Sequence, residues 1–322
     1  MHRPALIAAI VPLLLAGCVS ASRDEHAARE QVGAVGAALP AVDHRAELPA
    51  LPADATLADD LRFALLNHPQ VEAAFADWRA AVLAIGPARA LPDPKLTFQA
   101  DIAGSLTSLM PGFMFDLMAA GKRTAMAQEA TAAGEVARRR YVTAVLTTAA
   151  DVKKARAELT ALEATLALKR QMLALEEQAI QFSHAEHVTM HAMGSLDEMA
   201  ALLNQAAQLR LDVANLDDQR GALRAAFKAA LGLRRDAPDP PWPTAFTPSA
   251  APMPDDASFW TEAVAANPRL GEMRAMVAMA VAAVAVEQKA RTPDAAAGLM
   301  ADLKMNPVLW RPLGEISLPI WR

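Results

Sequence analysis

A stretch of about 70 residues, from Lys122 to Ala192, contains no proline and only one glycine, Gly134. Most of its residues are Ala, Leu, Glu, Lys and Arg, which are strong helix formers. We therefore expect one continuous helix, which at 1.5 Å per residue would be roughly 105 Å long. An ordinary globular domain has no use for such a helix, so its packing partners must be long helices as well.

A second helical stretch follows from Ser195 to Leu231. Gly194 is the natural hinge between the two helices. Ser195 and Glu198 have the spacing of a capping box, in which a Ser side chain caps the helix and a Glu three residues later bonds back. The sequence therefore predicts a long antiparallel helical hairpin over residues 122–231.

Residues 94–118, which precede this hairpin, are predicted to form a pair of strands. From Lys95 to Ile102 polar and apolar residues alternate, as in a strand with two unlike faces. One face would carry Leu96, Phe98, Ala100 and Ile102, and the other Lys95, Thr97, Gln99 and Asp101. A transmembrane strand with lipid on one side and a wet lumen on the other has this pattern. A soluble amphipathic hairpin would have it too.

The chain also contains an internal repeat with an offset of 201 residues. At this offset Pro92-Asp93 matches Pro293-Asp294, and the further matches are Asp101 with Asp302, Pro111 with Pro312, and Leu117 with Leu318. Asn67-His68-Pro69 and Asn267-Pro268 open helices in a similar way. We expect a first repeat at 56–235, a Pro-rich linker at 236–257 and a second repeat at 258–322 that is cut off after its strand pair. A complete second repeat would give a protein of roughly 430 to 450 residues.

The N-terminus has the features of an export signal. His2 and Arg3 precede an apolar run from Ala5 to Leu15, which is too short to span a bilayer, so residues 1–17 are predicted to be a signal peptide. Leu15-Ala16-Gly17-Cys18 resembles the lipobox of bacterial lipoproteins, which implies acyl chains such as palmitate on Cys18. The alternative is an ordinary signal peptide with a chance cysteine. Residues 18–55 show no lasting period and are expected to be a lipidated tether.

Composition and motifs argue against several functions. The net charge of −5 gives no basic footprint for nucleic acid. The sequence shows no phosphate-binding loop and no hydrolase or metalloprotease motif, so we expect neither an enzyme nor a cofactor. His184, His187 and His191 are spaced 3 and 4 apart and could share one helix face. They are candidate ligands for a transition metal, although a solvated polar face is the simpler interpretation, and no metal is assigned.

Together these features resemble the TolC-like outer-membrane efflux protein family, and in particular its lipoproteins. The resemblance rests on the lipobox, the two Asn-Pro helix starts, the two Pro-Asp pairs that precede strands, and Gly121-Lys122-Arg123 at the return to helix. It implies a mainly α fold with transmembrane β-structure, in which long antiparallel helical hairpins form a tunnel and β-hairpins from two repeats contribute to a shared trimeric barrel.

The same resemblance implies a function and partners. The chain would be an exit duct for small solutes, drugs or metal ions, anchored by lipid in the outer membrane and extending into the periplasm. Its partners would be two further copies in a homotrimer, a periplasmic adaptor protein and an inner-membrane efflux pump. The residues expected to contact the adaptor at the hairpin tip are His191, Gly194, Ser195, Leu196 and Asp197. The alternative is a periplasmic helical lipoprotein without a pore, which acts as a structural spacer or partner-binding coiled coil.

Overall fold

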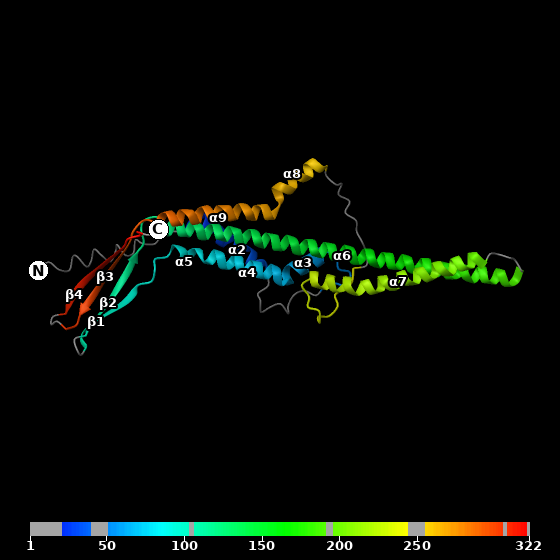
Figure 1. Cartoon of the computed structure of the whole chain (residues 1–322), viewed down its shortest axis with the longest axis horizontal. Coiled ribbons are helices and arrows are strands. Elements are labelled where there is room, and N and C mark those ends of the chain that lie inside the picture. The colour runs from blue at the N-terminus through cyan, green and yellow to red at the C-terminus, as the bar shows by residue number, and fades with distance from the viewer. Residues whose placement is uncertain are drawn as a thin grey trace. The chain divides into compact units, whose positions relative to one another are not determined.

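The computed structural model describes residues 21–39, 51–102, 106–190, 196–243, 255–304 and 308–320. Long helices and one small antiparallel sheet make up the fold, which confirms the predicted fold class of long helices with β-hairpins (Figure 1). In chain order the elements are α2 (Arg23–Ala38), α3 (Leu57–Asn67), α4 (Pro69–Leu83), α5 (Ile85–Arg89), β1 (Lys95–Ile102), β2 (Leu106–Leu117), α6 (Lys122–Met190), α7 (Leu196–Ala230), α8 (Asp256–Ala266), α9 (Pro268–Ala290), β3 (Asp294–Asp302) and β4 (Leu309–Ser317).

The chain divides into two compact units. The sheet unit consists of Met1–Ala38, Ala74–Val142 and Trp260–Arg322, and the hairpin unit consists of Leu39–Ala73 and Thr143–Phe259. The helices α4, α6 and α8 each contribute residues to both units.

In the hairpin unit, α7 lies along α6 (Figure 1). Six buried residues of α6 repeat at alternating steps of four and three, as in the seam of a coiled coil. They are Thr148, Val152, Ala155, Leu159, Leu162 and Leu166. Phe227, Ala230 and Leu231 at the end of the second arm close over this seam. The hairpin therefore has a buried core along part of its described length, from Thr148 to Leu166 on α6.

Ion pairs beside the seam set the register of the two helices. Three ion pairs join α6 to α7: Glu163 with Arg224 at 3.2 Å, Arg170 with Asp217 at 2.7 Å, and Glu177 with Arg210 at 2.8 Å. The partners rise by seven residues per step on α6 and fall by seven on α7, as an antiparallel coiled coil requires. Each exposed pair contributes only about 0.2–1 kcal/mol, so the apolar seam supplies stability and the pairs specify alignment.

The short helix α3 packs onto the same core. Thr56 caps it in a capping box with Asp59. The buried carboxylate of Asp60 forms an ion pair with Arg156 of α6. Burial raises the pKa of Asp60, and the hydrogen bond from Arg156 acts in the opposite direction. The helix ends at Asn67, whose side-chain amide donates to the Leu231 carbonyl at 3.2 Å.

The sheet unit contains four antiparallel strands in the order β1-β2-β3-β4. Both predicted strand pairs are present, one in each half of the chain. The central pairing joins β2 to β3, so that Phe113 lies opposite Leu299. The sequence repeat alone did not specify this contact between the two halves.

The predicted tether at 18–55 is wrong over Arg23–Ala38, which forms the helix α2. The Ser22 hydroxyl accepts a hydrogen bond from the Glu25 amide and begins the helix. Its small apolar residues Ala28, Val32 and Val35 pack against the aromatic and aliphatic cluster of α4 and α5. The helix α2 is short and its apolar side chains are small, so the sequence pattern alone does not reveal it. The cluster against which it packs lies more than 40 residues further along the chain.

Candidate functional site

The four strands give the sheet two chemically different faces. Residues that are opposite in antiparallel register point to the same side, and every second residue of a strand does so too. We call one side the apolar face; it consists of Leu96, Phe98, Ala100, Leu109, Pro111, Phe113, Phe115, Leu117, Ala295, Ala297, Leu299, Ala301, Trp310, Pro312, Gly314 and Ile316. None of these residues is charged. The uncharged side predicted for residues 95–102 therefore extends across all four strands.

The largest side chains of the apolar face are exposed in the single chain. Leu96 is 70% exposed, Phe98 64%, Trp310 58% and Ile316 69%. Burying one such side chain contributes about 1.5–3 kcal/mol, so this face in water would be strongly unfavourable. Apolar patches of this size mark surfaces that contact lipid or another protein.

We call the opposite side the polar face. Its described residues are Lys95, Thr97, Gln99, Asp101, Met110, Gly112, Met114, Asp116, Asp294, Ala296, Gly298, Met300, Asp302, Leu309, Arg311, Leu313, Glu315 and Ser317. Lys95 forms an ion pair with Asp116 at 2.7 Å, and Arg311 forms one with Asp302 at 2.7 Å. This face carries five carboxylates and two basic side chains, so it is acidic.

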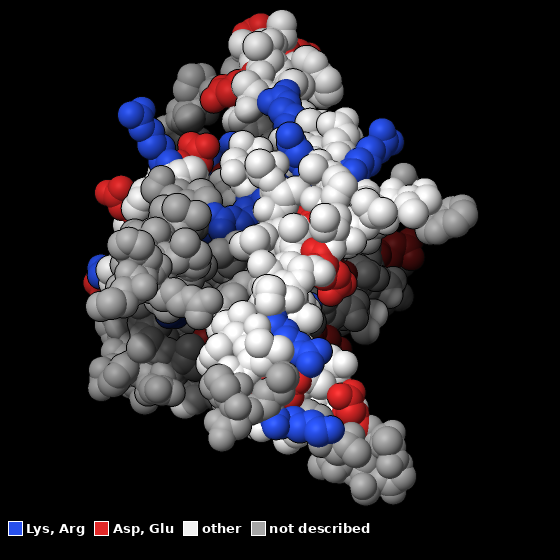
Figure 2. Space-filling view, turned by 90° about the vertical axis from the view of Figure 1, so that its left-hand side faces the viewer, with Lys and Arg blue, Asp and Glu red and all other residues white. Residues whose placement is uncertain are grey.

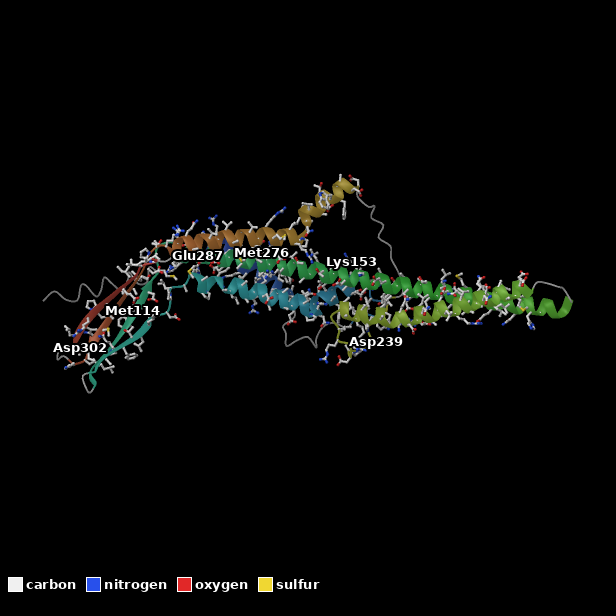
Figure 3. The ribbon with its side chains drawn as sticks, in the orientation of Figure 1. Met114, Lys153, Asp239, Met276, Glu287 and Asp302 are labelled. Atoms are coloured by element: carbon white, nitrogen blue, oxygen red, sulfur yellow. The ribbon has the colours of Figure 1, made fainter. Side chains whose placement is uncertain are left out.

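The division into two faces follows from the register of the strands. Figure 2 looks onto the end of the chain that carries the sheet, and its charged side chains are separated by broad areas of uncharged surface. Figure 3 places Met114 on β2 and Asp302 at the end of β3. The sheet therefore combines an apolar side without charge and an acidic side within one layer of strands.

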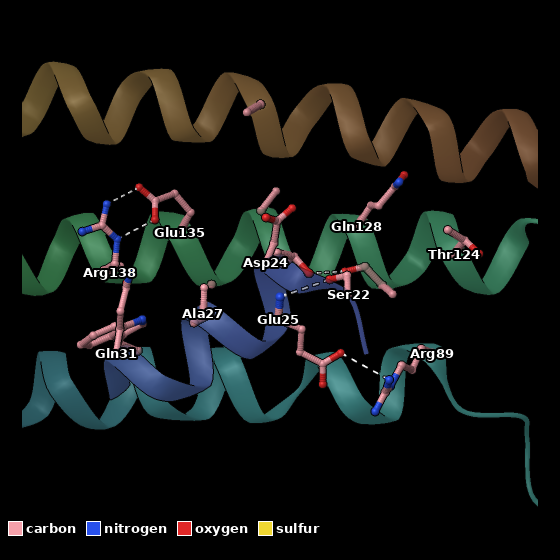
Figure 4. A pocket seen from close by; sticks show the side chains of 17 residues that line it. Ser22, Asp24, Glu25, Ala27, Gln31, Arg89, Thr124, Gln128, Glu135 and Arg138 are labelled. Atoms are coloured by element: carbon pink, nitrogen blue, oxygen red, sulfur yellow. Dashed lines mark hydrogen bonds and ion pairs between the residues drawn. The ribbon is translucent and has the colours of Figure 1, made fainter. Parts of the chain in front are cut away.

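A cavity of about 610 Å³ lies in the sheet unit beside α2 (Figure 4). Its buried carboxylate, Glu25, pairs with Arg29 at 2.9 Å and with Arg89 at 3.6 Å. On α6, burial acts to raise the pKa of Glu135, but hydrogen bonds from Arg138 and Arg139 outweigh it and lower that pKa. The pair with Arg89 joins α2 to α5, whereas both partners of Glu135 belong to α6 itself and stabilise its carboxylate form.

The residues expected at the hairpin tip are only partly described. Cys18, His191, Gly194 and Ser195 lie outside the described residues. Leu196 begins α7, and Asp197 is exposed in its first turn. The adaptor-contact tip and the lipidation of Cys18 stay predictions.

The metal candidates are also incompletely covered. His184 is exposed on α6, His187 lies in the same helix without a described side chain, and His191 is outside the described part. Among the residues that the structure describes, no group of three or more His, Cys, Asp or Glu is arranged to hold a metal ion. The helices in this part of the chain also include none that is both long and apolar enough to cross a membrane.

The fold is that of the TolC-like outer-membrane channels. Three solved structures illustrate it: the outer-membrane protein VceC of Vibrio cholerae, the CmeC outer-membrane channel of Campylobacter jejuni and the MtrE outer-membrane channel of Neisseria gonorrhoeae. In that order, their sequence identities to this chain are 16, 12 and 17%, and the matches cover 83, 82 and 82% of this chain. The TM-scores are 0.62, 0.64 and 0.64.

These similarities concern the fold and only part of each known channel. The chain spans 69, 61 and 63% of the lengths of these three proteins. No protein-family model matches the sequence, and no curated protein sequence matches it.

Proposed function

We propose that this chain is one protomer of an outer-membrane exit duct for small solutes, with its sheet in the bilayer and its helical hairpin in the periplasm. The observation that carries the proposal is the uncharged apolar face, which continues across all four strands while the opposite face is charged. Lipid against one side and water against the other satisfies both faces.

The lengths of the strands fit a bilayer. A tilted transmembrane strand needs about 9–11 residues, and β1 to β4 contain 8, 12, 9 and 9. A four-stranded sheet leaves β1 and β4 as open edges, which hydrocarbon does not tolerate, and barrels need at least about eight strands. Several copies must therefore close one barrel, and the family resemblance favours a homotrimer. The proposed duct is not an enzyme. The solutes that it exports would be drugs or metal ions.

The hairpin unit would extend away from the membrane toward an adaptor and an inner-membrane pump. Its ion pairs at steps of seven residues give a stiff two-helix arm in fixed register. We expect the tip of the hairpin, near Gly194 and outside the described residues, to contact the adaptor. An acylated Cys18 would add contact with outer-membrane lipid.

The test is a pair of neighbouring substitutions on β1. Phe98→Arg places a charge on the apolar face, where arginine near the bilayer midplane costs about 2–4 kcal/mol in each protomer. Gln99→Arg places the same charge on the polar face and is the matched control. We expect Phe98→Arg to abolish heat-modifiable oligomers in outer-membrane fractions, while Gln99→Arg preserves them. Equal assembly of both variants would refute the proposal and favour a spacer without a pore.

A further inference from the structure

Three methionines lie together on the polar face of the sheet. Met110 and Met114 are on β2, two residues to either side of Gly112. Gly112 is opposite Met300 of β3, and Met114 is opposite Gly298. Met300 is therefore the diagonal neighbour of both other methionines, and diagonal neighbours on a sheet are within reach of long side chains.

The two glycines leave the space that the methionines occupy. A Cβ atom at Gly112 would overlap the Met300 Cγ and would lie 3.0 Å from the Thr97 Oγ1. A Cβ atom at Gly298 would lie 3.2 Å from the Met114 Cβ. The Met300 side chain is thus packed over the bare backbone of Gly112, and Thr97 borders the same space.

Two of the three methionines are buried and Met114 is half-buried, although all three belong to the charged side of the sheet. Met110 is 3% exposed and Met300 4%. The Thr97 Oγ1 is also buried, and it has no hydrogen-bond partner among the described residues. Leaving such an atom unpaired costs about 1–3 kcal/mol, so the space beside Met300 lacks one polar or cationic group.

Neighbouring charges permit a cation there. Lys95 is opposite Met114 and Arg311 is opposite Met300, but Asp116 and Asp302 hold these two basic groups in ion pairs. Asp294 is paired as well, with Lys122 of α6. The strands of this face carry five carboxylates and two basic side chains, so the face attracts cations overall. Thioether sulfur is a soft, neutral ligand that favours Cu(I) and similar ions over hard cations.

We propose that Met110, Met114 and Met300 form a binding site for a soft monovalent cation, Cu(I) or Ag(I), with the Thr97 hydroxyl at its border. The proposal does not depend on membrane insertion, because all four residues belong to the folded sheet of a single chain. If the sheet lines a duct, the site faces the lumen.

Silver tests the site without redox chemistry. Titration calorimetry with silver nitrate, in chloride-free buffer with detergent, would use the full chain carrying Cys18→Ser, since the only thiol would otherwise dominate. The triple variant Met110→Leu, Met114→Leu and Met300→Leu should bind Ag(I) at least tenfold more weakly at one site per chain. The matched control replaces the same number of methionines on α9, Met273, Met276 and Met279, of which Met273 is 63% exposed, and should bind as before. Equal weakening of both variants, or of neither, would overturn the proposal.

A second measurement avoids any substitution in the sheet. With methyl-labelled methionine in the same chain, one equivalent of Ag(I) should shift the ε-methyl resonances of Met110, Met114 and Met300 together. Circular dichroism would show whether the triple variant keeps its fold. Shifts confined to other methionines would exclude the site whether or not the chain assembles in membranes, so the result is independent of the proposed duct.

Discussion

Two leucines on one helix test whether the seam of α6 holds the hairpin unit together. Leu159 is fully buried against Phe227 and Val152, whereas Leu168, nine residues further along α6, is 58% exposed. Changing either to alanine removes the same three carbon atoms and raises helix propensity slightly. Any difference in stability therefore reports packing.

The expected magnitudes follow from burial. Leu159→Ala removes three buried groups at about 0.8 kcal/mol each and leaves a cavity between two helices, which together give about 3 kcal/mol. Leu168→Ala should change stability by less than about 0.5 kcal/mol. Urea unfolding of the purified monomeric chain in detergent, followed by helical circular dichroism, measures both. If Leu168→Ala cost as much as Leu159→Ala, the helices would pack through a different face and the assigned seam would be wrong.

Three further predictions address local features. Gly232 has φ of +76°, and an added Cβ would lie 2.8 Å from the His68 Cα. Gly232→Ala should therefore lower the free energy of unfolding, measured in urea, by more than about 1 kcal/mol. The control is Gly221→Ala on the open surface of α7, which should stabilise the chain instead. Burial lowers the pKa of His68 although Asp151 acts against it, so this residue contributes stability above its unfolded pKa of about 6.5 that is lost as pH falls toward the folded value. His68→Gln should flatten the fall in melting temperature between pH 7 and 5, and an unchanged fall would contradict the assignment. At the tip, Leu196→Arg should impair solute export while oligomers still form, and export at the original rate would argue against adaptor contact there.

The features that the sequence predicted correctly depend on local patterns. The alternation from Lys95 to Ile102 needs no distant partner, so the strand over these residues could be predicted from the sequence. The helix α2 was missed because Val32 and Val35 are identifiable as core residues only when their contact with the cluster around Trp78 is known. The pairing of Phe113 with Leu299 joins residues far apart in sequence, and local periodicity carries no information about it.

The candidate sites show the same division. Glu163, Arg170 and Glu177 are charged residues spaced by seven along α6, a spacing that is visible in the sequence. Their partners on α7 can be identified only when the two helices are aligned in the structure. The methionine cluster requires the register of β2 and β3, which places Gly112 opposite Met300. Neither arrangement has a signature in a single stretch of sequence.

Labelling of single cysteines along β1 tests the central claim most directly. Leu96→Cys and Phe98→Cys lie on the apolar face, and Thr97→Cys and Gln99→Cys lie on the polar face. In intact outer membranes we expect a lipid-soluble maleimide to label the first pair and a membrane-impermeant maleimide to label the second, so that reactivity alternates at each residue. Labelling of all four cysteines by the impermeant reagent, without alternation, would contradict a sheet that separates lipid from a wet lumen.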